Sequence, residues 1–232
     1  IFAKTDAELA YGLAWAHSED DFKTIQQSYL AGNAILSKHI GLKGSGADFL
    51  TQFIGSDEIV ENRQKAAHNA SEILGFKWLD NANFPDNSMD SIPLLDVVKF
   101  IEAAKEKVHP TIVYTHSTAD LNIDHRIVAE ATMTAFRPQP DEKWKEIRAF
   151  EIPSATDYSH EDVTSSFYPN MFISIEEFWE KKHQALMQYQ GEIREEPHSR
   201  SLHGIETLAN YRGNQVGLNL AEAFQILRKI KR

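Results

Sequence analysis

The segment Thr111–Phe136, TIVYTHSTADLNIDHRIVAEATMTAF, contains the pattern that decides the fold. Its first five residues follow Pro110 and are apolar and β-branched, which is typical of a buried strand in a parallel sheet. The polar loop HSTADLNIDH comes next, followed by a predicted helix that runs from about Asp124 until Arg137-Pro138 stops it. Ligands of open α/β sheets bind at the carboxyl ends of strands, so this loop is where we expect functional side chains.

Helical and strand patterns alternate on both sides of this segment. An apolar stripe at helical spacing predicts a helix from Asp57 to Gly75, with Gly75 as its left-handed stop. Pro93 fits the first turn of a second helix that opens at Ser91, because its missing N–H is harmless there. The other predicted elements are strands at Phe76–Leu79 and Ile147–Ile152, a helix after a capping box of Ser174 and Glu177, and helices at Arg200–Arg212 and Leu220–Lys231.

This alternation predicts a single α/β domain over residues 1–232, built as a sandwich around a mainly parallel sheet. Residues 153–170 show no clear periodicity, which predicts a long loop over a site or a pair of irregular strands.

Composition excludes several classes of function. The chain has 232 residues and a net charge of −10, without a Lys/Arg cluster that would indicate a nucleic-acid partner. It has no cysteine for a disulfide, a thiolate metal site or a nucleophile, and no apolar run long enough to span a membrane. The lack of cysteine does not fix the compartment, because a secreted protein need not use disulfides. We expect a cytoplasmic protein, and assembly into a homo-oligomer stays open.

Two polar segments carry side chains that suit a metal ion. AHSEDD contains His17, Glu19 and Asp20, and the later loop contains His116, Asp120, Asp124 and His125. Neutral imidazoles and carboxylates are ligands of zinc, and a catalytic zinc keeps three protein ligands and one open position for water. The alternative interpretation of the same residues is surface charges and helix caps.

Beyond these patterns, the chain from about Asp57 to its end resembles the PIG-L/LmbE-like family of zinc-dependent N-deacetylases. The matching pieces are ENRQKAAHNASEILG, FPDNSMD, PTIVYTHSTADLNIDHRIVAEA, FEIPSAT, PNMF, PHSRSLHGIETLANYRG and AEAFQILR. The resemblance implies a Rossmann-like α/β fold, one catalytic Zn²⁺ and removal of an N-acetyl group from an amino sugar or its conjugate.

The resemblance also assigns roles to particular residues. It implies that His125 binds zinc and that Asn122, where many members have histidine, polarises the substrate carbonyl. In register with the family's first motif, His17 and Asp20 would be the other two ligands and Glu19 the general base. Ser18 stands where the family has proline, and Glu19 is one methylene longer than the usual aspartate.

Four further residues are candidates for substrate binding. His116 and Asp120 share the loop with Asn122 and would bind substrate or orient the ligands. Asp86 would reach the substrate, although an Asx turn with its neighbours explains it equally well. His198 would approach the site from the C-terminal region, or be a loop histidine without a role at the metal.

Residues 1–55 differ from this pattern and resemble the start of penicillin-acylase-type hydrolases, in which AHSEDD would lie in a helix. Two interpretations follow. In the first, AHSEDD completes the metal site, and the protein is a deacetylase or an amidase with another acyl substrate. In the second, the zinc site is incomplete, and the protein is a non-catalytic glycoconjugate-binding or inactive relative.

Overall fold

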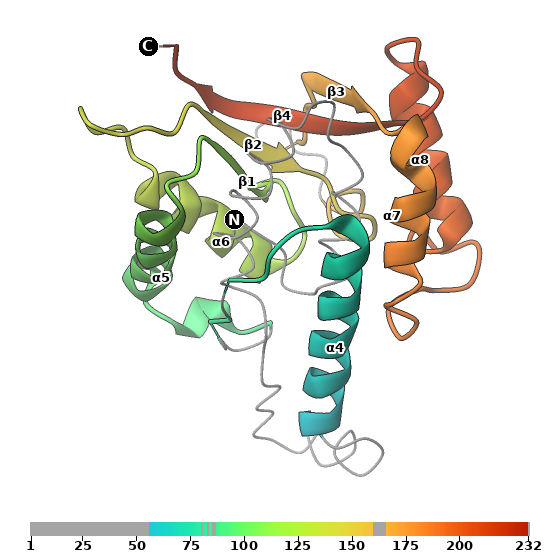
Figure 1. Ribbon diagram of the computed structural model, residues 1–232, viewed down its shortest axis with the longest axis horizontal. Coiled ribbons are helices and arrows are strands. Elements are labelled where there is room, and N and C mark those ends of the chain that lie inside the picture. The colour runs from blue at the N-terminus through green and yellow to red at the C-terminus, as the bar shows by residue number, and fades with distance from the viewer. Residues whose placement is uncertain (1–55, 80, 83, 85–86, 160–165, 232) are drawn as a thin grey trace.

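The computed structural model describes residues 56–79, 81–82, 84, 87–159 and 166–231. Within these residues, the strands form one sheet of four, and the helices lie around it (Figure 1). The helices are α4 (Ser56–Leu74), α5 (Leu94–Val108), α6 (Ile123–Ala135), α7 (Trp179–Leu186) and α8 (Leu202–Asn214), with 3-10 turns η2 (Met89–Ser91) and η3 (Glu176–Phe178). The strands are β1 (Ile112–His116), β2 (Glu146–Phe150), β3 (Met171–Ser174) and β4 (Ala221–Lys229).

The described sheet has the order β1-β2-β4-β3. Strands β1 and β2 are parallel, with His116 opposite Phe150, whereas β4 runs antiparallel to both β2 and β3. The predicted α/β class is confirmed, but the prediction of a mainly parallel sheet is wrong for the strands described. The cause is β4, which lies between β2 and β3 and makes both of its pairs antiparallel.

Strand β4 is also the largest error in the predicted elements, since a helix was expected at Leu220–Lys231. Its first four residues, Ala221–Phe224, are all buried, and both edges of the strand are paired. Hydrogen bonding to two neighbours and burial in the core override the helical spacing of Leu220, Phe224 and Leu227.

Two smaller predictions are also wrong. Residues 76–79 follow Gly75 without forming a strand, although Gly75 does end α4 with φ of 79° as predicted. The capping box at Ser174 does not form, because Ser174 ends β3 and α7 begins only at Trp179. Ile175 is fully buried and its N–H donates to the carbonyl of Leu220 at 3.0 Å, which keeps the chain against the sheet at this point.

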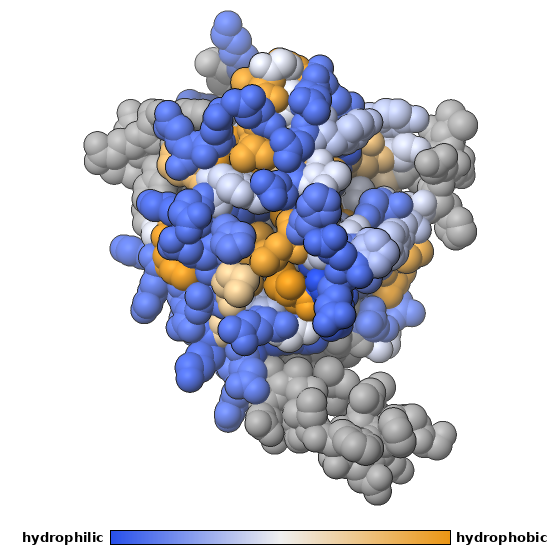
Figure 2. Space-filling view, turned by 90° about the vertical axis from the view of Figure 1, so that its right-hand side faces the viewer, coloured by the Kyte–Doolittle hydropathy of each residue, from blue (hydrophilic) through white to orange (hydrophobic). Residues whose placement is uncertain are grey.

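The helices lie in separate groups around the sheet (Figure 1). Helices α5 and α6 pack on each other, α4 packs on α7, and α8 packs on β4. The face on the α7 and α8 side is mainly hydrophilic, with hydrophobic residues in small groups near its centre (Figure 2). Among the described residues, no helix combines the length and apolarity that crossing a bilayer requires.

One hydrophobic core joins the helices to the sheet. Phe136, at the end of α6, meets Trp144 edge to face, with ring centroids 6.3 Å apart. On the sheet, Tyr114 of β1 meets Phe224 of β4 in the same manner at 5.5 Å. All four rings are at least 98% buried, so the core fixes the positions of β1 and α6 on either side of the polar loop.

The turn between α8 and β4 leaves no room for a side chain at Gly213. A Cβ there would lie 2.6 Å from the carbonyl oxygen of Leu218 and 2.8 Å from that of Asn219. We expect Gly213→Ala to lower the free energy of unfolding by about 1–3 kcal/mol, because the backbone leading into β4 must move. Urea unfolding measures the change.

Gly191→Ala is the matched control, since a Cβ at Gly191 meets nothing within 4 Å. We expect it to stay within about 0.5 kcal/mol of the parent chain. Equal effects of the two substitutions would contradict the packing of α8 against the start of β4.

Candidate metal centre

The carboxyl end of β1 and the first turn of α6 bring two histidines together. His116 is the last residue of β1, and His125 lies in the first turn of α6. Both side chains are fully buried, and their rings stack with centroids 4.0 Å apart and an angle of 12° between planes. The predicted strand, loop and helix are therefore confirmed, and they place imidazoles at the expected edge of the sheet.

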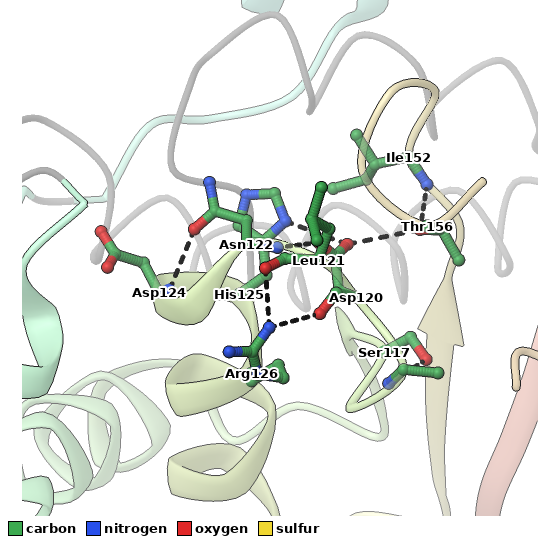
Figure 3. Close-up of polar contacts among 10 residues, drawn as sticks. Ser117, Asp120, Leu121, Asn122, Asp124, His125, Arg126, Ile152 and Thr156 are labelled. Atoms are coloured by element: carbon green, nitrogen blue, oxygen red, sulfur yellow. Dashed lines mark hydrogen bonds and ion pairs between the residues drawn. The ribbon is translucent and has the colours of Figure 1, made fainter. Parts of the chain in front are cut away.

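Asp120 holds this arrangement from the middle of the loop (Figure 3). Its Oδ2 lies 3.0 Å from Nδ1 of His125 and accepts a hydrogen bond from the Thr156 hydroxyl at 3.3 Å. Its Oδ1 accepts from the backbone N–H of Asn122 at 2.9 Å. Since Asp120 is 2% exposed, these contacts act in a poorly solvated environment, where hydrogen bonds to a charged group are strong.

The guanidinium of Arg126 closes the other side of the loop (Figure 3). Its Nη1 donates to the carbonyl oxygens of Asp120 and Leu121, at 2.7 Å each. The backbone N–H of Leu121 in turn donates to the carbonyl of Ala155. These bonds to Arg126 and Ala155 fix the backbone of residues 120–122.

His116, Asp120 and His125 form a group whose ligand atoms all lie within 4.8 Å of one another. Two imidazoles and a carboxylate are a donor set used by divalent transition metals. Because Nδ1 of His125 faces the Asp120 carboxylate, Nε2 is the atom left for a metal, and the carboxylate orients the ring. The residues present therefore fit a divalent cation.

Asn122 begins α6. Its Oδ1 accepts a hydrogen bond from the backbone N–H of Asp124 at 2.9 Å, which makes Asn122 the N-cap of the helix. Asp124 does not cap the helix: its buried carboxylate accepts from the backbone N–H of Met89 at 3.1 Å and holds the turn η2 against α6.

The other predicted site residues divide into two groups. His17, Glu19, Asp20 and Asp86 lie outside the described residues. His198 is described, and its contacts are with Arg200, whose N–H donates to Nδ1 at 3.0 Å, and with the ring of Tyr158, 6.2 Å away. These contacts place His198 beside the loop that follows β2.

A cavity of about 760 Å³ adjoins the loop of the two histidines. Ala119 and Thr156, which contacts Asp120, belong to its wall. Another part of the wall comes from α8 and includes Tyr211 and Arg212. Sequence analysis missed this cavity, although the loop after β2 was predicted to lie over a site.

An ion pair forms part of the cavity wall. Arg212 donates two hydrogen bonds to Glu151, from Nε at 2.7 Å and Nη2 at 2.5 Å. Burial raises the pKa of Glu151 above its ordinary value, against the opposing effect of Arg212. Burial would lower the pKa of Arg212, but the hydrogen bonds and charge of Glu151 outweigh it and raise that pKa.

Residues 23–136 match the PIG-L family, described as GlcNAc-PI de-N-acetylase. The match confirms the predicted resemblance, and it begins earlier than the expected start near Asp57. It includes His116, Asp120 and His125 but begins after the AHSEDD segment. The resemblance of the N-terminal part to penicillin acylases finds no support in the comparisons, and no curated protein matches the chain.

Solved structures of similar fold cover nearly the whole chain. N,N′-diacetylchitobiose deacetylase from Pyrococcus horikoshii is 16% identical with a TM-score of 0.65, covering 96% of this chain and 80% of that one. A zinc-inhibited form of teicoplanin deacetylase is 13% identical with a TM-score of 0.66, covering 96% of both chains. The 4-carboxy-2-hydroxymuconate hydratase GalB from Pseudomonas putida is 18% identical with a TM-score of 0.67, covering 99% and 95%. At these identities the likeness establishes the fold.

The cap at Asn122 can be tested by stability alone. We expect Asn122→Ala to lower the free energy of unfolding by about 1 kcal/mol, because the first turn of α6 loses its side-chain acceptor. Asn122→Asp retains an acceptor oxygen and should retain most of the stability. Thermal or urea unfolding of both variants measures this difference, and an Ala variant as stable as the Asp variant would contradict the capping role.

Proposed function

We propose that this chain is a metal-dependent hydrolase that removes an N-acetyl group from an amino sugar or its conjugate. The observation that carries the proposal is the buried His125, held by Asp120 at the carboxyl end of β1, within the part of the chain that matches the PIG-L family. The relatives named as deacetylases of diacetylchitobiose and teicoplanin support this class of substrate.

We assign the metal ligands to His125, through Nε2, and to His17 and Asp20 of the N-terminal segment. Zn²⁺ is the proposed ion, because two neutral imidazoles with one carboxylate suit it and leave a position open. The rival ligand set is His116, Asp120 and His125, whose ligand atoms are already close together. His125 belongs to both sets.

In the proposed reaction, the bound metal supplies Lewis acidity toward the acetamide carbonyl and an acidified water. Glu19 accepts the proton of the attacking water and then donates it to the departing amine. Asn122 donates from Nδ2 to the carbonyl oxygen as negative charge develops there. Asp120 keeps the imidazole of His125 in the required tautomer and orientation.

A non-catalytic glycoconjugate-binding protein is the second candidate function. It is favoured by one observation, that the family match begins at residue 23 and thus after His17, Glu19 and Asp20. The hydratase GalB shares the fold, so the fold by itself does not fix the reaction.

Metal content and turnover test the proposal together. We expect about one metal ion per chain after dialysis, and release of acetate from N-acetylglucosamine. His125→Ala should reduce metal below about 0.1 per chain and abolish turnover, since it removes a ligand common to both sets. Elemental analysis and an acetate assay measure the two quantities, with zinc and other divalent ions added back because zinc inhibits one deacetylase of this fold.

His203→Ala is the matched control, because His203 is an exposed residue of α8. It should leave metal content and turnover unchanged. A parent chain that binds no metal and gains no activity with any added ion would instead favour the non-catalytic protein.

A second experiment separates the two ligand sets. We expect His17→Ala to lose metal, and His116→Gln to retain at least about half of it, because only His17 belongs to the proposed set. His116 is buried, so its substitution can destabilise the chain. Thermal unfolding of both variants therefore checks that each remains folded. Loss of metal from the folded His116 variant alone would assign the site to His116, Asp120 and His125.

A further inference from the structure

Aromatic side chains line the cavity that adjoins the histidine loop. Tyr168 and Tyr211 both line it, and they are 62% and 56% exposed. Phe167 also lines the cavity, with the guanidinium carbon of Arg212 6.0 Å from its ring centroid. Rigid rings with an accessible face bind the apolar faces of flat ligands at a small cost in conformational entropy.

Hydroxyl groups form a second part of the wall. They belong to Thr156, Ser159, Ser166, Ser199 and Thr207. A Ser or Thr hydroxyl both donates and accepts, and so do the hydroxyls of a sugar. The volume of about 760 Å³ also falls in the roughly 300–1,000 Å³ typical of small-molecule sites.

The charges of the wall are unfavourable for an anion. Arg212 is the only cationic side chain among the described residues that line the cavity. Its Nε and Nη2 donate to Glu151, and its Nη1 donates to Gln215 at 3.0 Å. Asp157 adds a further carboxyl group to the wall. A phosphate in this cavity would therefore meet carboxylates and a guanidinium that is already engaged.

From these features we infer that the cavity binds an uncharged carbohydrate unit attached to the N-acetylated sugar, and that it disfavours a phosphorylated unit. Thr156 connects the two sites, since it lines the cavity and its hydroxyl donates to Asp120. A substrate of two linked rings can thus place one ring at the histidines and the other against Tyr168 and Tyr211. This inference rests on the proposed deacetylase function for the first ring.

Binding to the purified, metal-loaded full chain tests the inference. The probes are N-acetylglucosamine, its uncharged β-1,4-linked disaccharide and N-acetylglucosamine 1-phosphate, compared by isothermal titration calorimetry. We expect the parent chain to bind the disaccharide more tightly than either other probe. The double variant Tyr168→Ala, Tyr211→Ala should bind the disaccharide about tenfold more weakly, because each lost ring face contributes on the order of 1 kcal/mol.

Two controls separate ring stacking from a general disturbance. The double variant Tyr168→Phe, Tyr211→Phe keeps both rings and should bind the disaccharide within about threefold of the parent. Tyr158→Ala removes a tyrosine of similar exposure, 51%, that does not line the cavity. It should leave the affinity for the disaccharide unchanged. Binding of the monosaccharide should stay the same in every variant.

The inference is overturned if the disaccharide binds the double Ala variant as well as the parent, or if the phosphorylated sugar binds most tightly. Turnover is measured in parallel. A chain that binds the disaccharide in the expected pattern but releases no acetate would refute the deacetylase proposal and leave the carbohydrate cavity standing. Turnover without preference for the disaccharide would refute only the inference that the cavity binds a second carbohydrate unit.

Discussion

The contact between the Asp120 carboxylate and Nδ1 of His125, at 3.0 Å, is the interaction on which the candidate site depends. Both side chains are almost completely buried, and the carboxylate also binds the backbone of Asn122 and the hydroxyl of Thr156. An imidazole at the start of a helix would otherwise have several rotamers, and a metal ligand must have one. The carboxylate selects that rotamer and links it to the loop, to α6 and to the segment after β2.

The parallel pairing of β1 and β2 explains why these segments meet. It sets His116 beside Phe150, so the residues that follow each strand emerge at the same edge of the sheet. The loop after β1 supplies Asp120, and the segment after β2 supplies Glu151 and Thr156. Strand β4 pairs with the other edge of β2, and α8 packs on β4, so Arg212 reaches Glu151 across 61 residues of sequence. Strand β4, whose antiparallel pairing the sequence did not predict, therefore helps to build the cavity.

The part of the site that was predictable from sequence is local. TIVYT, a polar loop and a capped helix are consecutive in the chain, so periodicity and turn residues suffice to place His116 and His125 at a strand end and a helix start. The contact of Asp120 with His125 depends on the turn between them, and its geometry is set by contacts with Arg126 and Thr156 that spacing does not encode. Strand β4 was misread because its apolar residues also fit a helical period, and only its pairing with β2 and β3 decides between the two.

Chains of this fold include both deacetylases and a hydratase, so specificity must come from side chains placed on a common scaffold. In this chain, the candidate metal donors His116, Asp120 and His125 come from the end of β1, the loop after it and the start of α6, while the aromatic and hydroxyl groups of the cavity come mainly from the segment after β2 and from α8. Among the described residues, Ala119 lines the cavity from the loop of the histidines, and Thr156 lines it while its hydroxyl donates to Asp120, so these two residues connect the two sets. Because different elements supply the two sets, the size and charge of the attached group can be selected by residues such as Tyr211 without disturbing the geometry that Asp120 imposes on His125.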